Sequence, residues 1–383
     1  MGEPEGGARA EAVVDLTAIR HNVQVLLAAT APGAALMIVV KADGYGHGAL
    51  PVAQAALAAG ASWLGVCTLE EALELRAGVI DAPVLSWLHL PDEDFAPAIR
   101  AGVDLGVSSR AHLAGVLAGA RRAGRPARLH LKIDTGLTRN GAAPAEWDRL
   151  LDDAVRATAD GTAEVVAVWS HLAAADEPGH PATARQLEAF QRAYEEARIA
   201  GLEPALRHLG NSAAALVVPE AWFDLVRVGI AAYGIDPAPG LAAQAGITLQ
   251  PVMRLRAQLA NVKPIAAGDG VSYGWTWIAD QPTTVGLVPL GYGDGVPRHA
   301  SSKAEVQVGE ARARILGRVC MDQFVVAVPA GVAAGDEVVL FGSGADGGPT
   351  AQDWAEACGT ISYEIVTRIG GTAGRAERRW TRE

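Results

Sequence analysis

The sequence predicts an α/β barrel followed by a mainly antiparallel β domain. Residues 13–240 alternate short apolar runs with amphipathic segments rich in Ala and Leu, and the chain after Gly240 alternates apolar and polar residues between glycine-rich turns. Eight buried-type strands separated by helices favour parallel pairing, and eight such units in about 230 residues fit a (β/α)8 TIM-like barrel better than an open sheet. The later alternation is typical of antiparallel sheets.

The elements follow in order along the chain. The expected barrel strands are 36–40, 63–67, 84–87, 105–107, 129–133, 165–170, 206–209 and 225–228. The helices expected between them are 16–28, 49–59, 70–77, 109–123, 145–157 and 182–199. In the second domain we expect strands in 253–265, 283–289, 305–316, 323–329 and 337–341, and a late helix near 351–357. These assignments give a loose, polar N-terminal arm at 1–12, a barrel at 13–240 and a β domain at 241–383.

Composition narrows the class of protein. The chain has 383 residues, half of them hydrophobic, and a formal net charge of −11. A nucleic-acid partner is not expected, because neutralising phosphates needs a basic surface. No apolar run approaches the ~18 residues of a membrane span. The N-terminus is acidic with no apolar region after it, and three scattered cysteines form no metal-ligand pair. We therefore expect a cytoplasmic protein with no metal.

A lysine follows the first expected strand of the barrel. In VVKADGYGHG, Lys41 stands after the five apolar residues of the expected strand 36–40 and before a loop with three glycines. This end of a barrel normally contains the active site. Partial desolvation would favour the neutral amine, which could then form an imine. A surface lysine that caps a strand is the alternative, and position alone does not decide between the two.

Tyrosine and arginine positions add to this signal. Five of the six tyrosines lie among small or polar residues, which is typical of loops where the phenol is available for hydrogen bonding or proton transfer; they are Tyr45, Tyr233, Tyr273, Tyr292 and Tyr363. The eighth strand ends in VRVGI, where barrels commonly bind phosphate through backbone N–H groups. There Arg227 should point inward and need a partner, and Gly229 permits close approach.

Nine ordered segments give a family resemblance that covers residues 11–370. VVKADGYGHG, LKIDTGLTRNG, WSHLAAADE, HLGNSAAAL, VRVGIAAYG, VSYG, LGYGDG, GRVCMDQ and TISYEI resemble the motif set of alanine racemases, which are fold-type III pyridoxal-phosphate enzymes. The lysine motif alone is moderately specific, whereas its combination with the VSYG and CMD motifs is highly specific. The resemblance implies interconversion of L- and D-alanine by a homodimer with shared active sites, supplying D-alanine for peptidoglycan.

The resemblance also implies roles for particular residues. Lys41 would hold the pyridoxal phosphate covalently, and the residues around the cofactor would be Tyr45, His171, Ser212, Arg227, Gly229, Ile230 and Tyr363. Arg227 would contact the pyridine nitrogen, supported by His208, and His171 would link Arg227 to Tyr273. The substrate would meet Arg139, Met321 and Tyr292, with Met321 and Asp322 reaching the site from the partner subunit. Lys132 matches a lysine that is often carbamylated in this family.

These residue types suit racemisation. The reaction needs two groups on opposite faces of Cα, and Lys41 and the partner's Tyr273 can each act as acid or base. We expect two cations, Arg227 and His171, to favour the phenolate and the neutral amine. Because arginine only donates, the pyridine nitrogen should stay unprotonated. A carbamate on Lys132 would orient Arg139, which an unmodified lysine would repel.

Other activities stay open at this point. One alternative is a broader-specificity amino-acid racemase of the same fold, although Tyr292 and Tyr363 should narrow the pocket. A decarboxylase of this architecture would need different substrate residues, and a pyridoxal-phosphate carrier would lack the β domain. Six histidines show no partner pattern and are expected at the surface or in the core: His21, His89, His112, His130, His180 and His299.

Overall fold

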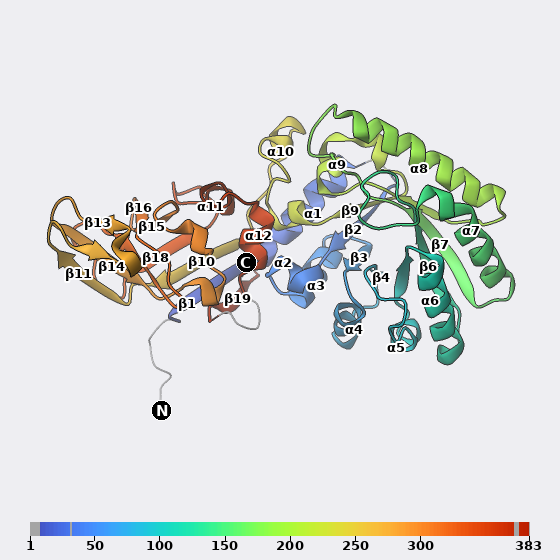
Figure 1. Cartoon of the computed structure of the whole chain (residues 1–383), viewed down its shortest axis with the longest axis horizontal. Coiled ribbons are helices and arrows are strands. Elements are labelled where there is room, and N and C mark those ends of the chain that lie inside the picture. The colour runs from blue at the N-terminus through green and yellow to red at the C-terminus, as the bar shows by residue number, and fades with distance from the viewer. Residues whose placement is uncertain (1–7, 31–32, 371–374, 383) are drawn as a thin grey trace.

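The computed structural model describes residues 8–30, 33–370 and 375–382 (Figure 1). The barrel and the β domain lie side by side along the long axis, so that the molecule is elongated. The two halves differ in topology: eight strands form a parallel sheet, and nine strands form a second, largely antiparallel sheet.

The barrel contains all eight expected strands in parallel. They are β2 (Ala35–Val39), β3 (Trp63–Val66), β4 (Val84–Ser86), β5 (Asp104–Val107), β6 (Ala127–Lys132), β7 (Ala163–Trp169), β8 (Leu206–His208) and β9 (Leu225–Val228). Neighbours follow the chain order from β8 to β2, and β9 pairs with β2. The backbone N–H of Arg227 donates to Gly210 O at 3.0 Å, which brings β9 back to the end of β8 and nearly closes the ring. The predicted fold class is confirmed.

Helices cover the outside of the barrel. The six predicted ones are α1 (Leu16–Ala29), α3 (Ala49–Ala58), α4 (Leu69–Ala77), α6 (Arg110–Ala123), α7 (Pro144–Ala159) and α8 (Pro181–Ile199). Side-chain oxygens of Asp15, Thr68 and Ser109 accept from the first backbone N–H groups of α1, α4 and α6 and fix where these helices begin. The sequence did not indicate α5 (Ala96–Arg100) or α9 (Ser212–Val217), which are too short to show a helical period.

The second sheet has the order β11-β14-β17-β16-β15-β18-β10-β1-β19. Its strands are β10 (Met253–Gln258), β11 (Asn261–Ile265), β14 (Thr283–Val288), β15 (Glu305–Val308), β16 (Ala311–Leu316), β17 (Phe324–Ala327), β18 (Glu337–Phe341), β1 (Ala10–Asp15) and β19 (Glu377–Thr381). A two-stranded ribbon, β12 (Gly270–Val271) and β13 (Trp277–Ile278), and the helices α10 (Leu241–Gln244), α11 (Ala351–Cys358) and α12 (Ser362–Thr367) complete the domain.

The expected loose arm at residues 1–12 is wrong from residue 10 onward. Strand β1 pairs antiparallel with β10 and parallel with β19, so it lies inside the second sheet. Its alternate residues Ala10, Ala12 and Val14 are buried, and their small size hid the strand pattern in the sequence. Residues 1–7 lie outside the described residues, and the domain bounds near residue 240 stay a prediction.

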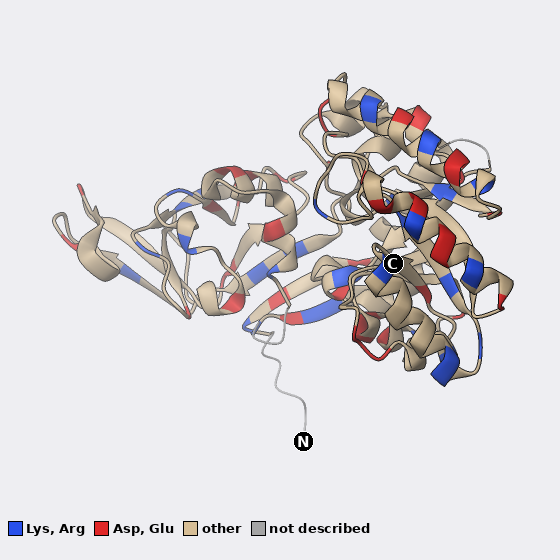
Figure 2. Ribbon diagram, turned by 45° about the vertical axis from the view of Figure 1, so that its right-hand side comes forward, with Lys and Arg blue, Asp and Glu red and all other residues tan. Residues whose placement is uncertain are grey.

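Charged residues are mixed over the outer helices. Figure 2 shows basic and acidic residues side by side along these helices rather than on separate faces. Within the part of the chain that the structure describes, no helix combines the length and apolar character that a membrane crossing requires.

A histidine pair lies beside β4, at the end of the barrel that also carries Lys41. Ser86 Oγ and His89 Nε2 are 2.8 Å apart, and His89 Nδ1 lies 3.3 Å from His112 Nε2. Burial, followed by the neighbouring His112, lowers the pKa of His89 to about 3, and burial lowers the pKa of His112 to about 4. Both rings are therefore neutral in the folded protein at neutral pH.

This pair should make stability pH-dependent. Because the folded pKa of His112 lies below its ordinary value of 6.5, the stabilisation is complete above pH 6.5 and is lost as the pH falls toward 4. A His112→Gln variant should lose the share of this dependence that comes from His112, at most ~1.4 kcal/mol per pH unit, while His89 keeps its own share. Urea unfolding at pH 7 and pH 5 measures it. The same change in the free energy of unfolding between pH 7 and pH 5 for the variant and the natural chain would contradict the assignment.

Candidate active site

The lysine loop after β2 has an unusual backbone. Ala42, Asp43 and Tyr45 all have φ of 52°, and Gly44 between them has φ of 61°, so that four consecutive residues are left-handed. Each non-glycine residue in this conformation costs roughly 1–2 kcal/mol. Contacts from outside the loop must therefore fix the direction in which Lys41 leaves the strand.

On the barrel side, Glu71 of α4 provides such a contact. One carboxylate oxygen accepts from the backbone N–H of Ala42 at 2.7 Å, and the other accepts from Cys67 N at 2.7 Å. The same side chain completes the capping box of α4 with Thr68. A single carboxylate thus joins the lysine loop to the end of β3.

On the other side, strand β19 of the β domain contacts the loop. Arg378 forms an ion pair with Asp43, and the indole N–H of Trp380 donates to His47 O at 2.8 Å. His47 is fully buried, and its Nδ1 lies 2.9 Å from Tyr45 O. Strand β19, the last strand of the described chain, therefore helps to fix the loop that follows Lys41.

Cations gather at this end of the barrel around two indole rings. Lys41 Nζ lies 6.0 Å from the centre of the Trp87 ring, and Lys132 Nζ lies 4.3 Å from the Trp169 ring. Arg227 Cζ is 5.0 Å from the same Trp169 ring. Burial, followed by Arg227 and Arg139, lowers the pKa of Lys132 to about 7. Such a field is complementary to anionic ligands.

Arg227 has only neutral partners. Its Nη1 lies 3.2 Å from His208 Nδ1, and its Nη2 lies 3.1 Å from His171 Nδ1. Nη2 also donates to Ser170 O at 2.9 Å and to Leu209 O at 3.2 Å. The expectation that His171 is a cation is wrong, because burial and then Arg227 lower its pKa well below the ordinary value. His208 is kept neutral in the same way.

The hydrogen bonds continue into the barrel through two residues whose role the sequence analysis missed. His208 Nε2 lies 2.8 Å from His130 Nδ1, and His130 Nε2 lies 3.1 Å from Asp104 Oδ2. Burial alone would raise the pKa of Asp104, but its bonds to His130 and Arg128 bring it below the ordinary value. His130 stands two residues before Lys132 on β6, which is the available signal that both side chains face inward.

Small residues and phenols line the far side of the barrel mouth. The backbone N–H of Gly229 donates to Ser212 Oγ at 2.9 Å, and Ile230 begins the short 3₁₀ turn that follows. A Cβ on Gly229 would lie 2.3 Å from the Tyr45 hydroxyl, so the two approach closely. The rings of Tyr45 and Tyr363 are 6.3 Å apart. Tyr233 is not available for chemistry, since it is buried and donates to Val39 O.

A second group of predicted residues lies on the β domain. Tyr273, Tyr292, Met321 and Asp322 line one hollow of about 680 Å³. The exposed fractions are 72% for Tyr273, 55% for Met321 and 44% for Tyr292, which is unusual for large hydrophobic side chains. Asp322 pairs with Arg375 at 2.7 Å. The hollow adjoins β13, which Figure 1 shows toward the far end of the β domain, whereas α2 (Lys41–Tyr45) lies near the middle of the molecule, where the two domains meet.

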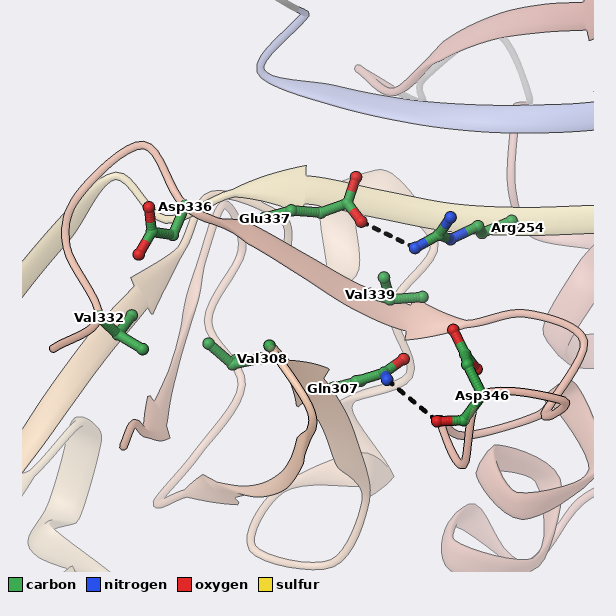
Figure 3. A pocket seen from close by; sticks show the side chains of 9 residues that line it. Arg254, Gln307, Val308, Val332, Asp336, Glu337, Val339 and Asp346 are labelled. Atoms are coloured by element: carbon green, nitrogen blue, oxygen red, sulfur yellow. Dashed lines mark hydrogen bonds and ion pairs between the residues drawn. The ribbon is translucent and has the colours of Figure 1, made fainter. Parts of the chain in front are cut away.

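Another pocket contains none of the predicted site residues. It lies on the β domain, has a volume of about 340 Å³ and is lined by Gln307, Asp336 and Asp346 among others (Figure 3). Its Arg254 is paired with Glu337 at 2.7 Å. The residues predicted to carry the chemistry therefore lie at the barrel mouth and around the hollow with Tyr273, and not in this pocket.

Fold and site together define a class. A lysine at the end of the first strand of a parallel barrel, surrounded by cations and followed by an antiparallel domain, is typical of a two-domain barrel enzyme acting on small anionic substrates. The family model described as alanine racemase, N-terminal domain, matches residues 14–237, and the C-terminal domain model matches residues 252–378.

Individual relatives agree with these matches. An alanine racemase of Salinispora tropica is 55% identical over 95% of this chain and 96% of its own length. The crystal structure of alanine racemase from Streptomyces lavendulae has a TM-score of 0.94 and 50% identity and covers 98% of each chain. That from Bacillus anthracis, with bound L-Ala-P, has a TM-score of 0.91 and 32% identity, covering 98% of this chain and 96% of its own.

The chain belongs to the alanine racemase family. Its activity is the racemisation of alanine, and its enzyme class is isomerase.

The contribution of the β19 contacts to the conformation of the lysine loop can be tested directly. Arg378→Ala removes the ion pair with Asp43 and should raise backbone mobility at 42–48 and lower activity several-fold, with a loss of about 1 kcal/mol in stability. Hydrogen–deuterium exchange of that segment provides the measurement. Arg379→Ala is the matched control, because Arg379 reaches Glu11 at 3.7 Å and not the loop. Equal exchange of residues 42–48 in both variants would argue against this role of Arg378.

Proposed function

We propose that this racemase holds pyridoxal phosphate on Lys41. When bound, this group supplies an electron sink that makes the Cα–H of an amino acid acidic. The residues present fit it: an amine at the strand end, cations that suit an anionic cofactor and substrate, and a close approach at Gly229 that a side chain would block. Family membership supports the same cofactor, because alanine racemases are pyridoxal-phosphate enzymes.

The phosphate would lie between Tyr45, Ser212, Gly229, Ile230 and Tyr363. Ser212 receives the N–H of Gly229, so its own hydroxyl proton is free to point toward an anion. Burial raises the pKa of both Tyr45 and Tyr363, which keeps these phenols protonated as donors. Backbone N–H groups at the start of a short turn, together with neutral donors, form a typical phosphate cradle.

Arg227 would face the ring nitrogen of the cofactor. Its guanidinium can only donate, so it accepts no proton and leaves that nitrogen unprotonated. His208 and His171, both neutral, hold the guanidinium in place without cancelling its charge. The acidity of Cα–H is then limited, which restrains side reactions that need a stable carbanion.

The two bases would be Lys41 and Tyr273 of the partner subunit. The observation on which this proposal rests is that Tyr273, which lies between β12 and β13, is 72% exposed. Figure 1 shows β13 toward the end of the β domain that is far from the barrel. A two-fold pair of subunits would bring the exposed hollow of one subunit over the barrel mouth of the other and complete two sites at once. His171 would then accept a hydrogen bond from Arg227 and donate one to the phenol of the partner's Tyr273.

Mixing two inactive variants tests the shared site. Lys41→Ala and Tyr273→Phe should each lower kcat by at least ~10²-fold, because each removes one acid–base group. After subunit exchange, each heterodimer contains one intact site, so an equal mixture should regain about a quarter of the natural activity. Chiral analysis of alanine measures it. No recovery, with exchange confirmed by native mass spectrometry, would refute shared sites.

The substrate carboxylate would bind Arg139, with Lys132 modified. A lysine whose pKa is about 7 has a substantial neutral fraction at neutral pH, so it can add to CO₂. The new N–C bond gives a carbamate, and the amine releases one proton to solvent. The resulting anion would be stabilised by Arg227 and Arg139, the same neighbours that disfavour the ammonium form of Lys132.

Carbamylation predicts a specific signal. With ¹³C-labelled bicarbonate, the natural protein should show one carbamate carbon resonance that is absent in Lys132→Met. The fraction modified should fall as the pH drops below about 7, because the ammonium form of Lys132 cannot react. A labelled carbon that persists in Lys132→Met, or no labelling of the natural protein at pH 8, would contradict the assignment.

The cellular role follows from the activity. We infer that the enzyme acts in the cytoplasm and supplies D-alanine for peptidoglycan. Tyr292 and Met321 at the hollow, with Tyr363 at the barrel mouth, would narrow the entrance and favour a substrate as small as alanine.

A further inference from the structure

A chain of four buried side chains crosses the barrel interior. It begins at Asp104 on β5 and passes through His130 on β6 and His208 on β8 to Arg227 on β9. All four are at most 4% exposed. At the outer end, Arg128 Nε donates to the other Asp104 oxygen at 2.9 Å, and Glu164 accepts from Arg128 at 3.0 Å. Only this outer end reaches solvent.

The two ends of the chain fix every proton between them. An ionised Asp104 can only accept a hydrogen bond, and Arg227 can only donate one. Three hydrogen bonds join these ends through two imidazoles, and Arg227 supplies the first proton. His208 must therefore carry its proton on Nε2, and His130 must also carry its proton on Nε2. A second proton on either ring would place two donors face to face in one of the three bonds.

We infer that Asp104 and His130 are positioning residues for the racemase reaction, since together they fix the His208 tautomer that presents a lone pair to Arg227. The inference rests on the proposed role of Arg227 at the cofactor ring. The carboxylate orients the guanidinium from three hydrogen bonds away, and two neutral rings separate the charges. A carboxylate placed directly on Arg227 would orient it equally well but would weaken its field at the ring nitrogen.

The effect extends to His171. Arg227 Nη2 donates to His171 Nδ1, so the single proton of the neutral His171 ring lies on Nε2. That N–H is directed away from Arg227 and is available to the phenol proposed as second base. Asp104 thus influences both the group at the cofactor ring and the group beside the proton-transfer residue.

Asp104→Asn separates this role from a packing role. The two residues have nearly the same shape, but Asn has one acceptor oxygen where Asp has two. Arg128 needs an acceptor, so the Asn oxygen faces Arg128 and the Asn NH₂ group faces His130 Nε2. His130 must then move its proton to Nδ1, His208 must move its proton to Nδ1, and an N–H of His208 meets an N–H of Arg227.

The experiment is a tautomer measurement on the holoenzyme. Two-bond ¹H–¹⁵N correlation spectra of histidine-labelled protein, with His208 assigned from the cross-peaks lost in His208→Gln, should show the Nε2–H form in the natural chain. Asp104→Asn should show the Nδ1–H form or a protonated ring. Its kcat should fall about 10- to 100-fold with KM for alanine nearly unchanged, as for other groups that orient a catalytic residue indirectly.

Glu164→Gln is the matched control. It removes the next carboxylate outward, which contacts Arg128 and not the histidines, so the tautomers and kcat should stay as they are. A His208 Nδ1–H form in the natural protein would overturn the inference, even if Asp104→Asn failed to fold. So would an Asp104→Asn enzyme with an unchanged tautomer or unchanged kcat. The tautomer spectrum does not depend on turnover, so a failure of the proposed cofactor chemistry would be recognised separately.

Discussion

The site depends on one buried cation that has no carboxylate beside it. Arg227 is 4% exposed and makes four hydrogen bonds, all to neutral acceptors. Burying a charge in this way is costly unless its protons are all satisfied. Two histidines and two backbone carbonyls accept from Nη1 and Nη2 and reduce this cost, and because none of them is charged they do not cancel the field of the guanidinium toward the barrel mouth. Because Arg227 lies on β9, where the barrel ring closes, that closure fixes the position of its guanidinium.

The second constraint is the strained loop after β2. Four left-handed residues in succession would not keep this conformation alone, and they are fixed by Glu71 from the barrel and by Arg378 and Trp380 from β19. Residues of both domains therefore fix the loop that follows Lys41, although the domains occupy different parts of the sequence. The same logic holds for β1, which precedes the barrel in the chain but lies in the sheet of the other domain. The domains are coupled through the lysine that each helps to position.

Local patterns predicted the barrel well because its strands are continuous apolar runs separated by capped helices. They failed where the signal was short or spread over distant segments. Strand β1 was hidden by alanines, and β19 pairs with a strand more than three hundred residues earlier. Among the site residues, Lys41 and Arg227 were evident from strand ends and motifs. Asp104 and His130 were not, because their meaning depends on neighbours on β5, β6 and β8 that only the closed barrel brings together.

The charge of His171 shows why the remaining features of the site could not be predicted from the sequence. Sequence motifs place a histidine near an arginine, and either a cation or a neutral acceptor is consistent with that proximity. The observed Nη2–Nδ1 contact of 3.1 Å requires a lone pair on the histidine, so the ring is neutral. His171 therefore adds nothing to the positive field that Arg227 and its cationic neighbours produce at the barrel mouth. Like charges at this end of the barrel repel one another, and an anionic ligand would relieve that repulsion. The repulsion among these cations thus sets the preference of the site for anionic ligands. The neutral histidines keep that repulsion from increasing, because they add no positive charge.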